Sequence, residues 1–136
     1  MTPNLLVTAG VSIIGLLGFA HLLLTFIGPR LLPRDRSLVD AMRNVSPVIT
    51  TQTTIWKAWI GFNASHSMGA MLFGLVYGYL ASGELLFHSP FLQVVGFCML
   101  AGFVVLAKLY WFITPLVGSS VALLLYVVGI AMTWQA

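Results

Sequence analysis

Two histidines and several neutral polar residues lie inside apolar stretches of this sequence, and they are the residues best suited to chemistry. His21 lies in the first apolar stretch, four residues before Thr25. Asn63, His66 and Ser67 lie in the second stretch at spacings that a helix places on one face. Imidazole can exchange a proton, form hydrogen bonds or ligate a metal. Because unpaired polar groups are costly in hydrocarbon, we expect these side chains to face inward and to meet.

The composition indicates a membrane protein. Of 136 residues, 60% are hydrophobic and 7% are charged, whereas soluble domains carry about 25% charged residues. Six basic and three acidic residues are too few to cover a water-exposed surface. The basic residues cluster at the ends of apolar stretches, so they are read as a topology signal and not as a nucleic-acid-binding surface. The single cysteine, Cys98, excludes an internal disulfide.

The hydrophobic pattern predicts an all-α integral membrane four-helix bundle, formed by residues 1–136 as a single four-span domain. Each apolar stretch is near or above the roughly 20 residues that cross a bilayer. The first ends at Gly28 and Pro29, a stop signal, and we expect it to be a retained helix and not a cleaved signal peptide. The expected helices cover about residues 4–27, 55–81, 91–109 and 114–134.

Residues 29–53 form a hydrophilic connection that we expect to be cytoplasmic and to contain a short interfacial helix. Leu38, Ala41, Met42 and Val45 follow an amphipathic helical pattern. Such a helix lies on a membrane surface, either as a contact for lipid headgroups or a partner, or simply as a tethered connector. The dipeptide at residues 46–47, Ser-Pro, breaks this helix or starts an extension of the next helix through VITTQTT.

The distribution of charge predicts the orientation. Four arginines lie in residues 29–53, Lys57 begins the second membrane helix and Lys108 ends the third. In a four-span arrangement all six lie on one side, and the opposite loop carries Glu84 without a basic residue. By the positive-inside rule, both termini are expected on the periplasmic side of a bacterial inner membrane.

The polar residues on three helices are predicted to lie at similar depth. At about 1.5 Å per residue, His21, Asn63 and His66 lie roughly 9, 10 and 15 Å inside their helix ends, and Ser119 and Ser120 roughly 8 to 9 Å. Small residues at every fourth position of the second helix predict a helix-packing groove. The first helix is expected to fit into this groove, so that His21 points at Asn63, His66 or Ser67. The packing residues are Gly61, Ser65 and Gly69, continued by Gly74 and Gly78 on a neighbouring face.

Three interpretations of the cluster stay open, and the sequence does not decide whether the protein is an enzyme. The side chains can be interhelical hydrogen-bond partners in an accessory subunit of other membrane proteins. They can form a pocket for a lipid, quinone or sterol-like molecule, with aromatic walls. They can also serve a redox protein or another enzyme, in which His21 and His66 hold a cofactor or act as acid and base. Because two histidines lack the third ligand of a usual zinc site, no metal site is predicted. The candidate ligand-binding residues are His21, Thr25, Trp59, Asn63, His66, Ser67, Ser119 and Ser120.

The second helix also carries a resemblance. Phe62, Asn63, Ser65, His66, Ser67 and Gly69, preceded by Trp56 or Trp59, form the motif F-N-x-S-H-S-x-G. Together with the membrane histidine of the first helix and the basic loop, this motif resembles a group of small bacterial four-helix inner-membrane proteins of uncharacterised activity. The layout is more loosely similar to the DoxX-like membrane proteins. The resemblance implies a four-helix membrane fold and no catalytic assignment.

Overall fold

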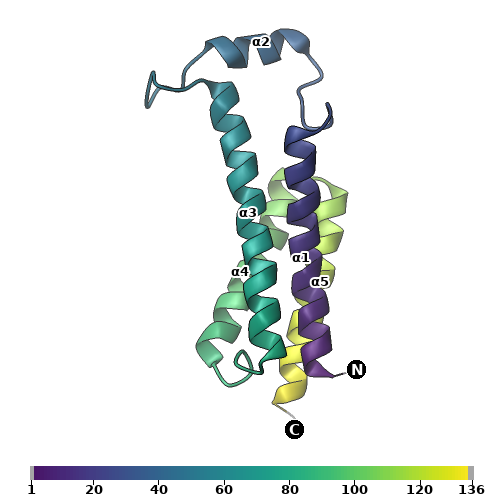
Figure 1. The fold of residues 1–136 in the computed structure, drawn as a ribbon. Coiled ribbons are helices and arrows are strands. Elements are labelled where there is room, and N and C mark those ends of the chain that lie inside the picture. The colour runs from purple at the N-terminus through teal and green to yellow at the C-terminus, as the bar shows by residue number, and fades with distance from the viewer. Residues whose placement is uncertain (1, 135–136) are drawn as a thin grey trace. The chain divides into compact units, whose positions relative to one another are not determined.

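The computed structural model describes residues 2–134 and is all-α, as expected. Five helices follow one another in these residues (Figure 1). Their limits agree within one or two residues with the four long helices expected, and the short helix lies inside the hydrophilic connection. The helices are α1 (Pro3–Phe26), α2 (Arg36–Asn44), α3 (Ile55–Ser82), α4 (Pro90–Tyr110) and α5 (Ile113–Thr133).

Three of these helices, α1, α4 and α5, are long and apolar enough to cross a membrane. This indicates a bilayer environment and a multi-pass protein. Helix α3 is the longest, at 28 residues, but it does not reach the same hydropathy. The reason lies in its first half, where Lys57, Asn63 and His66 interrupt the apolar residues. Composition therefore supports three of the four expected spans.

By its internal contacts the chain divides into two units, to which α1 and α3 both contribute. The bundle unit comprises residues 1–17 and 70–136, and the loop unit comprises residues 18–69. The single four-span domain expected from the sequence stays a prediction. Each unit is described separately below.

The bundle unit has one apolar core to which α1, α3, α4 and α5 all contribute. Small residues allow the helices to approach closely. A Cβ added to Gly10 of α1 would lie 2.7 Å from the carbonyl oxygen of Ala122 in α5, and one added to Gly74 of α3 would lie 3.0 Å from the Gly15 Cα of α1. The core residues are Val7, Val11, Ile14, Ala70, Phe73, Tyr77, Ala81, Leu86, Leu100, Phe103, Ala122 and Tyr126.

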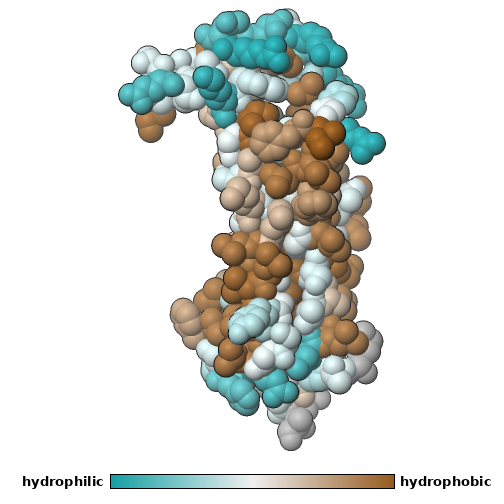
Figure 2. All heavy atoms as spheres, viewed as in Figure 1, coloured by the Kyte–Doolittle hydropathy of each residue, from teal (hydrophilic) through white to brown (hydrophobic). Residues whose placement is uncertain are grey.

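The loop unit contains the hydrophilic helix α2, and Figure 2 shows hydrophilic residues gathered over it. Asp35 caps α2, because its carboxylate accepts hydrogen bonds from the Ser37 backbone N–H (2.9 Å) and hydroxyl (2.8 Å). These bonds hold the pKa of Asp35 below its ordinary value. The Arg43 guanidinium lies 5.3 Å from the centre of the Trp56 ring, a cation–π contact that links α2 to the start of α3.

The segment between α2 and α3 is not the helical extension offered by one interpretation of VITTQTT. Residues 45–54 form turns and bends, and α3 begins only at Ile55. The Val45 carbonyl accepts a hydrogen bond from the Ile55 N–H at 2.8 Å, which closes this segment into a loop. The Thr54 hydroxyl accepts a hydrogen bond from the Lys57 N–H at 3.3 Å and caps α3.

Candidate functional site

The loop unit brings His21 and His66 together around Asn63. The Nε2 atom of His21 on α1 lies 2.9 Å from Oδ1 of Asn63 on α3. The Asn63 amide nitrogen donates to the carbonyl oxygen of Trp59 at 2.8 Å, which fixes the orientation of the amide. Since Oδ1 can only accept, Nε2 of His21 carries the proton and donates it. In its neutral form, His21 is therefore the tautomer whose Nδ1 carries the lone pair.

The His66 ring lies beside the His21 ring. Their centroids are 5.7 Å apart and the planes meet at 82°. Phe62, one turn earlier on α3, stacks against His66 with centroids 6.4 Å apart. Both histidines are half-buried, whereas Asn63 is only 6% exposed. The amide therefore lies inside the helix contact, and the two imidazoles lie at its accessible edge.

The hydroxyl groups near the cluster donate hydrogen bonds to their own helices. Thr25 donates to the His21 carbonyl oxygen and Ser67 donates to the Asn63 carbonyl oxygen, each at 2.8 Å. These back-bonds to the preceding turn satisfy the hydroxyls locally. The interhelical contact of the loop unit thus depends on the His21–Asn63 bond more than on the serine and threonine residues expected to share it.

Ser119 and Ser120, the other predicted members, belong to the bundle unit. Ser119 is buried, and its hydroxyl donates to the Pro115 carbonyl oxygen at 2.7 Å within α5. Ser120 is exposed. Their participation in the histidine cluster stays a prediction. Trp59, in the loop unit, contributes its carbonyl oxygen to the cluster through Asn63, while its ring is partly exposed.

The glycine residues of α3 differ in what surrounds them. Gly61 and Gly69 have open space where a Cβ would lie, and Ser65 between them is exposed. The groove predicted for α1 at these three residues is therefore not where α1 lies. Gly74 instead meets the α1 backbone, and Gly78 lies at ordinary contact distance from the Val11 side chain. The correction has a simple cause: small residues recur on both faces of α3, and spacing alone does not choose between them.

Sequence reasoning missed a second polar group, in the bundle unit. Gln93 of α4 is buried. Its backbone carbonyl oxygen accepts a hydrogen bond from the Tyr126 hydroxyl of α5 at 3.0 Å. The Tyr77 hydroxyl of α3 donates to the carbonyl oxygen of Leu92 at 3.0 Å. Tyr77 itself lies in the core. A glutamine inside the apolar run 90–107 was the available signal.

Within residues 2–134, no three or more His, Cys, Asp or Glu side chains are grouped as a metal ion would need. The single cysteine, Cys98, is exposed on α4. Comparison with known proteins found no matching family model, no matching curated protein and no matching solved structure. The chemistry of the two units therefore has to be argued from their own residues.

Proposed function

We propose that the protein is a four-span membrane protein that binds a small amphipathic molecule at the His21–Asn63–His66 cluster. In this proposal α3 is the fourth span, the loop around α2 is cytoplasmic and both termini lie outside a bacterial inner membrane. The layout of the small bacterial four-helix proteins that the α3 motif resembles is consistent with it. An accessory role beside other membrane subunits is compatible with the same site.

The length of α3 supports its role as a span. Its 28 residues extend about 42 Å at 1.5 Å per residue, beyond the roughly 30 Å of a hydrocarbon core. The uninterrupted apolar part, residues 68–81, extends only about 21 Å. A spanning α3 therefore carries His66 and Asn63 into the hydrocarbon or its border, where a hydrogen-bonded partner on α1 stabilises them.

The observation that carries the binding proposal is the orientation of His21. Its Nε2 donates to Asn63, and its Nδ1 accepts no hydrogen bond from the described residues. An imidazole acceptor at the half-buried edge of the helix contact, with the His66 and Phe62 rings beside it, suits a ligand hydroxyl or N–H group attached to an apolar body. Asn63 positions the imidazole and is itself too buried to meet the ligand.

The alternative is a redox protein or another enzyme that uses His21 and His66 as ligands or as acid and base. The Asn63 bond occupies Nε2 of His21, so a cofactor bound there would need Nδ1. This geometry favours the binding role over ligation through Nε2. An absorbance spectrum of the purified protein separates the two, since a haem gives a strong Soret band that depends on its axial histidines.

The test is to identify what co-purifies with the protein. Native mass spectrometry in mild detergent would compare the wild type with His21→Ala and His66→Ala. We expect a bound uncharged amphipathic molecule in the wild type, reduced at least tenfold in both variants. His88→Ala is the matched control, because this third histidine is exposed in the α3–α4 loop.

Equal occupancy in all four proteins would contradict the proposed site. A molecule lost equally from all three histidine variants would indicate general destabilisation, which thermal unfolding in the same detergent measures. An empty wild-type protein together with a Soret band would favour the redox alternative.

A further inference from the structure

The side-chain amide of Gln93 has one satisfied end and one unsatisfied end. Its nitrogen donates to the carbonyl oxygens of Leu86 at 3.3 Å and Phe87 at 3.0 Å, in the loop before α4. Two acceptors on the same side fix the amide orientation, because a flipped amide would set oxygen against oxygen. The assignment of Nε2 and Oε1 is thereby fixed, and Oε1 of Gln93 faces away from these two carbonyl groups. It accepts no hydrogen bond from any described residue.

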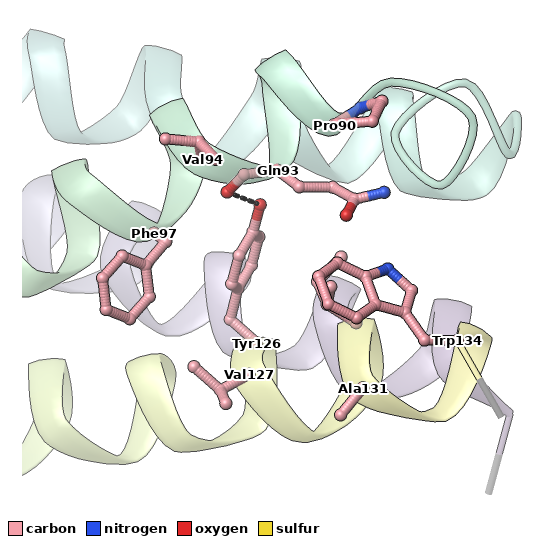
Figure 3. A pocket seen from close by; sticks show the side chains of 9 residues that line it. Pro90, Gln93, Val94, Phe97, Tyr126, Val127, Ala131 and Trp134 are labelled. Carbon is pink, nitrogen blue, oxygen red and sulfur yellow. Dashed lines mark hydrogen bonds between the residues drawn. The ribbon is translucent and has the colours of Figure 1, made fainter.

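This oxygen is buried, since Gln93 is only 6% exposed. A buried carbonyl oxygen without a donor is destabilising, and native proteins rarely tolerate one without a ligand, water or functional reason. In Figure 3 the oxygen end of the amide is turned toward the indole of Trp134, which follows the last residue of α5. The unsatisfied acceptor therefore points to the space between the start of α4 and the end of α5.

That space is a pocket of about 340 Å³, entirely within the bundle unit (Figure 3). Its volume is at the small end of the range for ligand sites, about 300 to 1,000 Å³. Apart from Gln93 and the Tyr126 hydroxyl, which already donates to the Gln93 backbone, its lining is apolar or aromatic. The lining residues are Pro90, Gln93, Val94, Phe97, Tyr126, Val127, Ile130, Ala131 and Trp134.

We infer that this pocket binds an uncharged, lipid-soluble alcohol whose hydroxyl donates a hydrogen bond to Oε1 of Gln93. The apolar lining takes the hydrocarbon body, and the amide oxygen provides the polar recognition. This site is distinct from the histidine cluster of the loop unit, so it holds whether or not the proposed function is correct.

The chemistry of the pocket narrows the ligand. A carboxylate or phosphate would direct negative oxygens at Oε1, which is repulsive. An ammonium group would bring a charge into an apolar lining without a counter-charge, which is costly. A quinone carries only acceptors and cannot donate to Oε1, whereas an aliphatic, sterol-like or aromatic alcohol can.

The experiment uses two probes that differ in one hydrogen-bond donor, para-bromobenzyl alcohol and its methyl ether. Bromine quenches tryptophan fluorescence on contact, so binding is followed through Trp134 in the full chain reconstituted in lipid nanodiscs. The Trp134→Phe variant supplies the signal of the other tryptophans. Concentrations are corrected for partitioning into the bilayer. We expect half-maximal quenching of Trp134 at a concentration of the alcohol that is at least about fivefold lower than that of the ether.

Two variants test the assignment in different ways. Gln93→Met removes the acceptor and should abolish the preference for the alcohol. Because it also removes the bonds to the α3–α4 loop, Ala131→Phe serves as a second variant, which fills the pocket and should weaken both probes. Val105→Phe, an exposed position on α4 outside the pocket lining, is the matched control and should bind like the wild type. Equal half-saturation by alcohol and ether in the wild type, or an unchanged preference in Gln93→Met, would overturn the inference.

Discussion

At the scale of single residues, Asn63 has the central role in the loop unit. Its amide donates to the Trp59 carbonyl within α3 and accepts from His21 of α1. A hydrogen bond between membrane helices contributes only about 0.6 kcal/mol on average and up to about 1.7 kcal/mol. The bond therefore specifies which tautomer and orientation His21 adopts more than it stabilises the fold.

A double-mutant cycle measures this bond. We expect His21→Leu and Asn63→Leu to be coupled by about 0.6 to 1.7 kcal/mol in the free energy of unfolding, measured by denaturant titration in micelles. Ser119→Ala provides the control, because its hydroxyl donates only within α5 and it belongs to the other unit. Its coupling to Asn63→Leu should be near zero. Additive effects of the His21 and Asn63 substitutions would show that the bond is absent in solution.

At the scale of the helix, α3 presents two faces lined by small residues, and they differ in their contacts with residues 2–134. Gly74 lies against the α1 backbone, whereas Gly61 and Gly69 have open space. The close approach in the bundle unit depends on the absence of a Cβ at Gly74 of α3 and at Gly10 of α1.

Glycine substitutions distinguish the two kinds of position. Gly10→Ala would put a Cβ 2.7 Å from the Ala122 carbonyl oxygen, a backbone atom that cannot rotate away. We expect it to destabilise the protein by about 1 to 3 kcal/mol, the usual cost of overpacking. Gly69→Ala meets no atom and removes a flexible residue from a helix, so it should be neutral or stabilising. Thermal unfolding of both variants measures the difference, and equal destabilisation would contradict the helix contact described for Gly10.

The helices themselves were predictable from the sequence, because apolar runs, prolines and capping residues mark their ends. A contact of His21 with Asn63, His66 or Ser67 was expected, since polar groups at similar depth in an apolar chain find one another. Which of the three accepts the hydrogen bond of His21 did not follow from the sequence. The face of α3 used by α1 did not follow, because two faces carry the same small-residue spacing. The polar group at Gln93 was not predicted either. A glutamine inside an apolar run is visible in the sequence, but its partners are backbone carbonyls, which no side-chain pattern reveals.

At the scale of the whole molecule, the topology depends on whether α3 crosses the membrane. If only α1, α4 and α5 cross, the α2 loop and the α3–α4 loop lie on the same side. If α3 also crosses, they lie on opposite sides. The basic residues favour the second arrangement, because all six then lie on the cytoplasmic side and the loop with Glu84 lies outside.

Cysteine labelling decides between these arrangements. In a Cys98→Ser background, single cysteines would be introduced at three exposed positions: Thr51 after α2, His88 before α4 and Thr114 at the start of α5. A membrane-impermeant maleimide applied to spheroplasts should label His88→Cys at once, and Thr51→Cys and Thr114→Cys only after permeabilisation. Joint labelling of Thr51→Cys and His88→Cys would show that α3 does not cross the membrane. The reversed pattern would show that α3 crosses but that the charges do not set the orientation. Only the expected pattern agrees with a cytoplasmic α2 loop and with termini on the outer side, as the charges predict.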